Sequence, residues 1–212
     1  MHLTTIFFDL DDTLYPSSAG LWKAIKLRMI EYMHTHLRIP EDEIPLLRER
    51  YFLKYGTTLR GLQEHHQVDA QEYLAYVHDL PVQDYLTPDP AQRAIIASLP
   101  MRKLIFTNAD VAHARRVLRV LELDDLFPVI VDVNAVSPFC KPMPESFAIA
   151  LKSGGERSPA RCVMIDDLTR TTRAARAAGL TGILYGGSAL NGDANACFTD
   201  WNELPGILER LS

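Results

Sequence analysis

The chain has 212 residues, 47% of them hydrophobic, with a formal net charge of -5 and an isoelectric point near 5.8. A chain of this length can bury roughly 70% of the surface that its unfolded form exposes, so one sizeable core is expected. The acidic balance and the lack of a Lys/Arg cluster argue against a nucleic-acid partner, whose phosphates require a basic face.

The chain opens with a short β-rich run at residues 3–8, and the acid-rich motif DLDDT follows at once. Asp9 and Asp11 stand two residues apart, so extended geometry would direct both side chains to one face. Asp12 is one residue out of phase and is expected to point away. Buried strands seldom end in such crowded negative charge, which makes this position a candidate functional site.

The next segment, residues 17–86, interrupts the strand pattern, because it contains amphipathic helices and no convincing strand. Helices are expected over residues 20–37, 41–55 and 69–80. The Pro-rich stretch at 86–92 is expected to be the linker that returns to the sheet. We therefore predict a helical cap, residues 17–86, inserted into a core formed by residues 1–16 and 87–212.

From residue 103 onward, strands and helices alternate. Strands are expected over 103–106, 128–133, 161–165 and 181–185, and helices over 109–121, 144–152 and 169–178. This order predicts an α/β fold whose parallel sheet is covered by helices on both faces.

The residues that follow each predicted strand are rich in polar groups. They are Asp9, Asp11 and Thr13 after the first strand, Thr107 and Asn108 after the second, Lys141 after the third, and Asp166 and Asp167 at the fourth. Ligands of open parallel sheets bind beyond the carboxyl ends of the strands, so these groups should share one edge. Crowded carboxylates require a cation, and oxygen ligands without His or Cys favour Mg²⁺. Thr107, Asn108 and Lys141, with the N-terminus of the next helix, would then bind a phosphoryl group.

These groups fit phosphoryl transfer. A carboxylate beside phosphorus can attack it and form an aspartyl-phosphate that water later breaks. A second carboxylate can protonate the leaving oxygen and then deprotonate the water. We predict Asp9 as the nucleophile, Asp11 as the general acid and base, and Lys141 as the third catalytic group. Each motif alone more often caps a helix or lies in a loop, and their joint order along the chain favours catalysis.

The motifs DLDDT, IFTN, CKP and IDD resemble those of the haloacid dehalogenase superfamily, and the resemblance covers nearly the whole chain. It implies a Rossmann-like core with a helical cap inserted after the first motif. It also implies Mg²⁺ held by the side chains of Asp9 and Asp166 and the backbone carbonyl of Asp11. Asp167 and Thr13 would support these ligands without touching the metal.

Within the superfamily, DLDDTLYP, KYGTTLRGL, FTNAD and CKPMPESF resemble the pyrimidine 5′-nucleotidase-like subgroup. This implies a nucleoside 5′-monophosphate, such as UMP or CMP, as the small-molecule phosphomonoester. The fourth motif of the subgroup continues as DDSxxN, whereas this chain has Leu168 and Thr171 in DDLTRT. The departure is expected to tune the metal affinity without abolishing activity.

The cap is expected to select the substrate, because it closes over the phosphoryl site and excludes water. The stretch YGTTLRGL at residues 55–62 has the composition of a loop that touches a polar ligand. Arg60 is a candidate donor to a base or ribose, and Tyr15 is a candidate stacking partner. Trp22 fits a helical stripe and is expected to pack in the core, and His113 is expected to be structural.

Other activities remain open. A sugar-phosphate phosphatase or a phosphomutase would use the same motifs. A haloacid dehalogenase is disfavoured by Asp11, because carbon–halogen displacement needs neither Mg²⁺ nor a general acid. A phospho-accepting signalling domain is disfavoured by the order of the acids and by the cap. The oligomeric state is not predicted.

Three cysteines without CxxC spacing, Cys140, Cys162 and Cys197, favour a reducing compartment. The N-terminus lacks the pattern of a signal peptide, and no apolar run approaches the roughly 20 residues that a membrane span requires. The expected location is the cytoplasm, without a membrane partner.

Overall fold

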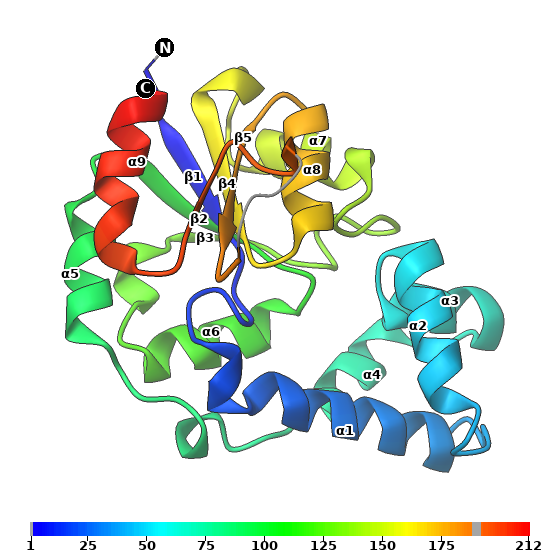
Figure 1. The fold of residues 1–212 in the computed structure, drawn as a ribbon. Coiled ribbons are helices and arrows are strands. Elements are labelled where there is room, and N and C mark those ends of the chain that lie inside the picture. Colours follow the sequence, from blue (N-terminus) through cyan, green and yellow to red (C-terminus); the bar gives the residue numbers. More distant parts are fainter. Residues whose placement is uncertain (1, 188–191) are drawn as a thin grey trace.

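The structure, a computed structural model, describes residues 2–187 and 192–212. Its core is a parallel sheet in the order β3-β2-β1-β4-β5-β6 (Figure 1). The strands are β1 (Thr5–Phe8), β2 (Arg102–Phe106), β3 (Val129–Val131), β4 (Cys162–Asp166), β5 (Thr181–Tyr185) and β6 (Ala196–Phe198). The predicted α/β fold with a parallel sheet is confirmed, and the edge strand β6 has no counterpart among the predicted strands.

Strand β1 lies inside the sheet and places the first acidic motif. It pairs with β2 on one side and β4 on the other, and Phe8 is level with Ile105 and Ile165. The residues that follow Phe8 and Ile165 are Asp9 and Asp166, so these two acids leave the sheet side by side. The backbone N–H of Asp9 continues the ladder by donating to the carbonyl of Ile165 at 2.9 Å.

Successive residues of β1 pack against different helices, as the two-residue period of a strand requires. Ile6 and Phe8 belong to one buried cluster and Phe7 to another. The helices are α5 (Pro90–Ser98), α6 (Val111–Val120), α7 (Pro144–Ser153), α8 (Thr169–Ala177) and α9 (Leu204–Leu211). Figure 1 shows α5 and α9 on one side of the sheet and α7 and α8 on the other.

The segment between β1 and β2 is helical, as predicted. Its helices are α1 (Leu21–Thr35), α2 (Ile44–Tyr55), α3 (Thr58–His66) and α4 (Ala70–Val77). Figure 1 shows these helices beyond the end of the sheet toward which the strands run. They form the cap over the edge that carries the polar motifs. No helix within the described ranges combines the length and apolar character needed to cross a membrane.

Helix α3 corrects the prediction of a loop at residues 55–62. Thr57 caps this helix, because its side chain accepts a hydrogen bond from the backbone N–H of Arg60 at 3.2 Å. At Gly61, a Cβ atom would lie only 2.2 Å from Cγ of Tyr51 on α2. Glycine is therefore required here for close packing of two helices and not for the freedom of a loop.

The return to the sheet is also shorter than predicted. Asp89 caps α5 by accepting hydrogen bonds from the backbone N–H groups of Ala91 at 2.9 Å and Gln92 at 3.2 Å. Pro90 occupies the first turn, where its missing N–H costs nothing. The Pro-rich stretch at 86–92 thus ends inside a helix, and only its first part is a linker.

Candidate active site

Three carboxylates meet where β1 and β4 end. One oxygen each of Asp9, Asp166 and Asp167 lies within 4.8 Å of the other two. The first two side chains are buried, since Asp9 is 8% and Asp166 is 1% exposed. Buried like charges repel strongly unless a cation or proton compensates them. The donor set consists of oxygen atoms only and fits a hard divalent cation such as Mg²⁺.

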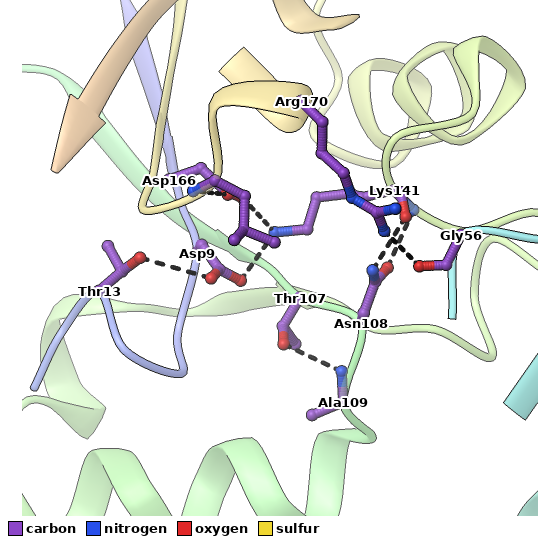
Figure 2. A network of polar contacts seen from close by, with 10 residues as sticks. Asp9, Thr13, Gly56, Thr107, Asn108, Ala109, Lys141, Asp166 and Arg170 are labelled. Carbon is purple, nitrogen blue, oxygen red and sulfur yellow. Dashed lines mark hydrogen bonds and ion pairs between the residues drawn. The ribbon is translucent and has the colours of Figure 1, made fainter. Parts of the chain in front are cut away.

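Lys141 supplies part of this compensation. Its Nζ donates to Oδ1 of Asp9 and to Oδ2 of Asp166, both at 2.7 Å (Figure 2). Burial alone would lower the pKa of Lys141, but Asp166 and Asp9 hold it above its usual value. When all three carboxylates are ionised, one ammonium leaves two negative charges unbalanced, and a divalent cation would balance them.

The carboxylates themselves resist ionisation. Burial raises the pKa of Asp9 well above its usual value, and Asp166 and Asp167 add to the rise while Lys141 opposes it. Burial and Asp166 also raise the pKa of Asp167 to about 7. The cluster is therefore short of positive charge, a second indication that it suits a cation.

Asp166 keeps a hydrogen bond that orients it, although Leu168 and Thr171 depart from the subgroup motif. The backbone N–H of Leu168, rather than a side chain, donates to Oδ1 of Asp166 at 2.9 Å. Thr171 is 2% exposed and lines the cavity described below. Since a backbone group holds Asp166, this contact does not depend on the identity of residue 168.

The groups after β2 hold the lysine segment. Asn108 donates from Nδ2 to the carbonyl of Lys141 at 3.0 Å and accepts at Oδ1 from its N–H at 2.9 Å (Figure 2). Thr107 accepts at Oγ1 from the N–H of Ala109 at 3.0 Å. Both residues line the cavity. The Asn108 amide thus fixes the backbone of Lys141, a contact that the sequence did not predict.

Asp11 lies in a different environment from Asp9. Its Oδ1 accepts from the hydroxyl of Tyr15 at 2.6 Å and lies 2.9 Å from Nε2 of His113. Burial alone would raise the pKa of Asp11, but His113 and then Tyr15 lower it below its usual value. Tyr15 is 3% exposed and does not line the cavity, so the structure brings it to Asp11 and not to a bound base.

His113 connects Asp11 to the cap. The imidazole is fully buried and stacks on the ring of His78 with 4.1 Å between centroids. His78 follows α4 of the cap, and its Nδ1 lies 2.5 Å from Oδ2 of Asp110. Sequence reasoning missed this group, because His113 and Asp11 are 102 positions apart and no local pattern pairs them.

Two further residues of the first motif face the site. Asp12, with a positive φ of 59°, lines the cavity, so the expectation that it points away is wrong. Burial and Asp11 raise the pKa of Asp12 to about 6. Thr13 donates from Oγ1 to Oδ2 of Asp9 at 3.4 Å (Figure 2), a long contact to the oxygen that Lys141 does not bind.

A cavity of about 490 Å³ lies between the core and the cap. Asp9, Asp11, Lys141 and Asp166 line its core side, and Trp22, Arg48, Phe52 and Tyr73 line its cap side. Trp22 is half-buried and also packs against the main hydrophobic cluster, so it has the expected packing role and a face toward the cavity. The volume is in the range of small-molecule sites.

Arg60 does not line the cavity. Its Nη2 donates to the carbonyls of Val133 at 2.6 Å and Phe139 at 2.8 Å, and its Nε donates to Phe139 at 3.2 Å. Arg170 makes the reverse connection, from α8 of the core to the carbonyls of Phe52 at 2.8 Å and Gly56 (Figure 2). These two arginines fasten cap and core together, and the structure does not bring Arg60 to a substrate.

Arg60→Met is expected to lower the free energy of unfolding by roughly 2–4 kcal/mol, because two carbonyls lose a charged donor while the apolar stem is kept. Urea unfolding measures the change. The matched control is Arg119→Met on α6, where the exposed arginine should cost less than about 0.5 kcal/mol. Equal losses in both variants would show that the connection adds no stability.

The fold and the site define a capped α/β protein with an acidic site at the carboxyl edge of its sheet. The model of the haloacid dehalogenase-like hydrolase family matches residues 3–179, so the chain belongs to this family of hydrolases. The superfamily assignment made from the four motifs is confirmed.

Individual relatives agree with this assignment. Phosphate metabolism protein 8 of Saccharomyces cerevisiae is 32% identical over 193 residues, which cover 84% of this chain and 60% of that protein. A conserved haloacid dehalogenase-like protein of Agrobacterium tumefaciens has a TM-score of 0.65 at 18% identity, with 99% of each chain covered. A putative hydrolase of Bacillus subtilis, bound to magnesium, has a TM-score of 0.63 at 19% identity, covering 98% of this chain and 99% of that one. Structural similarity at these identities shows the shared fold.

Proposed function

We propose that the protein is a Mg²⁺-dependent phosphomonoester hydrolase that works through an aspartyl-phosphate on Asp9. One observation carries the proposal: Asp9, Lys141 and Asp166 meet at the floor of a cavity that the cap closes from above. The floor supplies a nucleophile, an ammonium for phosphoryl oxygens and carboxylates for a cation. We take residues 17–86 as the cap and residues 1–16 and 87–212 as the core.

The proposed cation ligands are the side chains of Asp9 and Asp166 and the backbone carbonyl of Asp11. Asp167 and Thr13 would support them, since Asp167 belongs to the carboxylate cluster and Thr13 donates to Asp9. When bound, Mg²⁺ supplies positive charge that lets a phosphoryl dianion approach a carboxylate.

In the first step, an oxygen of Asp9 attacks phosphorus, and the bond from phosphorus to the ester oxygen breaks. Lys141 and groups of the segment at Thr107 and Asn108 bind the phosphoryl oxygens. Asp11 gives its proton to the leaving oxygen. The dianion favours this protonated form of Asp11, because a nearby negative charge raises the pKa of a carboxyl group.

In the second step, Asp11 takes a proton from water, and the water oxygen attacks phosphorus. The bond between Asp9 and phosphorus breaks, which releases inorganic phosphate and restores Asp9. The ionised Asp11 that this step requires is the form that His113 and Tyr15 favour in the free protein. The same two contacts hold the carboxylate in one orientation through both steps.

The proposed substrate is a nucleoside 5′-monophosphate with a pyrimidine base. Support comes from the subgroup motifs and from a cavity with aromatic walls. A relative named for phosphate metabolism is consistent with phosphoryl chemistry. Phosphate release from UMP, CMP, sugar phosphates and pyridoxal phosphate tests the proposal. Isomerisation of a sugar phosphate without phosphate release would identify a mutase, and chloride release without metal would identify a dehalogenase.

Removal of the metal is expected to abolish phosphate release, and added Mg²⁺ to restore it. Mg²⁺ at about 100 times its dissociation constant should also add about 2.7 kcal/mol to the free energy of unfolding. Thermal unfolding with and without Mg²⁺ measures this gain. Asp166→Asn should lose most of it, whereas Glu64→Gln, an exposed acid on α3, should keep it. Full phosphatase activity in excess chelator would contradict the proposed metal role.

A further inference from the structure

The cap side of the cavity carries polar groups that the phosphoryl chemistry does not use. Arg48 on α2 and Tyr73 on α4 both line the cavity. In the proposed reaction, Lys141 and the segment at Thr107 and Asn108 hold the phosphoryl group at the opposite, core side. Whatever leaves with the ester oxygen must therefore lie against the cap wall.

Both polar groups have unmet hydrogen-bonding capacity. Tyr73 is 1% exposed, and its hydroxyl has no partner among the described residues. Within the described part of the chain, the Nε of Arg48 is also buried without a hydrogen-bond partner, and its Nη2 donates to the sulfur of Met29 at 3.6 Å. Buried polar groups in native proteins almost always have a partner, so two such groups on one cavity wall indicate a ligand that accepts hydrogen bonds.

The two groups form one site. Both side chains line the same cavity, and burial raises the pKa of Tyr73 while Arg48 partly opposes the rise. The ring of Tyr73 is held in an edge-to-face contact by Tyr32, with 5.1 Å between centroids. Its hydroxyl is therefore fixed in position before any ligand binds.

Two aromatic side chains lie in the same cavity wall as the two donors. Trp22 and Phe52 line the same wall. Arg170 covers the ring of Phe52 at 3.5 Å from the centroid and fixes it through the carbonyls of Phe52 and Gly56. Glu49 and Lys26 also line the cavity, so charges of both signs lie beside the aromatic rings. Aromatic walls with neutral and cationic donors suit a planar, uncharged group that carries carbonyl oxygens.

We propose that Arg48 and Tyr73 form a head-group subsite that binds carbonyl oxygens of a planar leaving group and thereby determines which phosphomonoester is cleaved. The inference rests on the proposed function, because it takes the phosphoryl group to lie at Asp9. It adds the residues that read the opposite end of the substrate. Uracil has carbonyl oxygens on a flat ring, so UMP is the probe.

Ribose 5-phosphate is the matched comparison, because it has the same reacting end as UMP and lacks the base. Wild type is expected to have a kcat/KM for UMP at least about tenfold above that for ribose 5-phosphate. Tyr73→Phe should lower kcat/KM for UMP by about three- to tenfold, and Arg48→Met by about ten- to a hundredfold, mainly through KM. Both variants should leave ribose 5-phosphate within about twofold of wild type.

Arg50→Gln serves as the control for Arg48, because Arg50 is an exposed arginine on the same helix and does not line the cavity. Arg50→Gln should leave kcat/KM for both UMP and ribose 5-phosphate unchanged. Equal losses on UMP and ribose 5-phosphate in the Tyr73 and Arg48 variants would overturn the subsite, as would a wild type that does not distinguish the two esters. A larger dependence on Arg48 for 3-phosphoglycerate would assign the wall to a carboxylate and would also overturn it.

A binding measurement separates this inference from the proposed function. Calorimetric titration of UMP into Asp9→Asn requires no turnover, and the added Tyr73→Phe change should weaken UMP binding by the same three- to tenfold, which corresponds to about 0.7–1.4 kcal/mol. If the protein does not hydrolyse UMP but UMP binding still depends on Tyr73, the proposed function is wrong and the head-group subsite stands. Binding of UMP that is indifferent to both Tyr73 and Arg48 would remove it, whatever the enzyme hydrolyses.

Discussion

Asp9→Asn is expected to lower kcat for every phosphomonoester by about 10⁴-fold or more, because a neutral amide oxygen cannot serve as the nucleophile. Lys141 would still pair with Asp166 at 2.7 Å, so the phosphoryl-binding ammonium stays in place. Phosphate release measures the loss. Intact-mass spectrometry of quenched reactions should find a phosphorylated chain in wild type and none in the variant.

The fold of Asp9→Asn should survive. Burial, with Asp166 and Asp167 close by, raises the pKa of Asp9 in the folded chain above its unfolded value. The unfolded chain therefore loses this proton at lower pH, and stability falls as pH rises between the two pKa values. A neutral amide removes this cost, so the free energy of unfolding at neutral pH without metal should equal or exceed that of wild type.

The control for this experiment is Glu209→Gln, an exposed acid on α9 far from the motifs in sequence. It should keep full activity and stability. An Asp9→Asn protein that retains wild-type turnover would disprove the nucleophile assignment outright. Lost activity with a lost fold would be visible in the same unfolding measurement, so the two causes can be told apart.

The position of the acidic site at the carboxyl edge of the sheet could largely be predicted, because neighbouring parallel strands end at the same edge. Once residues 3–8 and 161–165 are taken as neighbouring parallel strands, their next residues must leave the sheet together, and Asp9 and Asp166 do so. The period of two within β1 likewise follows from local sequence. These features depend on geometry within a few residues of the chain, so the composition and spacing of the sequence are enough to predict them.

The parts that could not be predicted depend on pairing between distant segments. Arg60 has the composition expected of a ligand contact, but its partners are carbonyls more than 70 residues away. His113 lies within a helix and shows no local sign of its contact with Asp11. Gly61 resembles loop glycine until Tyr51 is placed beside it. In each case the residue type was informative and its partner was set by the tertiary fold.

The contacts of Asp11 lead to the second large expected effect. Asp11→Asn keeps an oxygen that can accept from Tyr15 and His113, so the side chain should keep its position. It removes the group that gives and takes protons. Steady-state turnover of UMP is expected to fall by about 10²- to 10⁴-fold, the range that general acid–base groups contribute.

p-Nitrophenyl phosphate separates the two proton transfers. Its leaving group departs as a stable anion and needs no acid, so phosphorylation of Asp9 should stay fast in Asp11→Asn. Hydrolysis of the aspartyl-phosphate still needs a base and should be slow. The variant is therefore expected to release a burst of about one p-nitrophenolate per active site, followed by slow turnover, while Asp9→Asn should show no burst.

His113→Gln tests whether the acid and base role depends on the orientation of the carboxyl group. His113 contacts Asp11 and does not line the cavity, so its loss should reduce UMP turnover less than Asp11→Asn does, without a burst. The two variants combined should lose little more than Asp11→Asn alone, because His113 acts only through that carboxyl group. Losses that multiply would show that His113 acts on the substrate by a separate route. Equal losses on UMP and p-nitrophenyl phosphate in Asp11→Asn, with no burst, would remove Asp11 from proton transfer altogether.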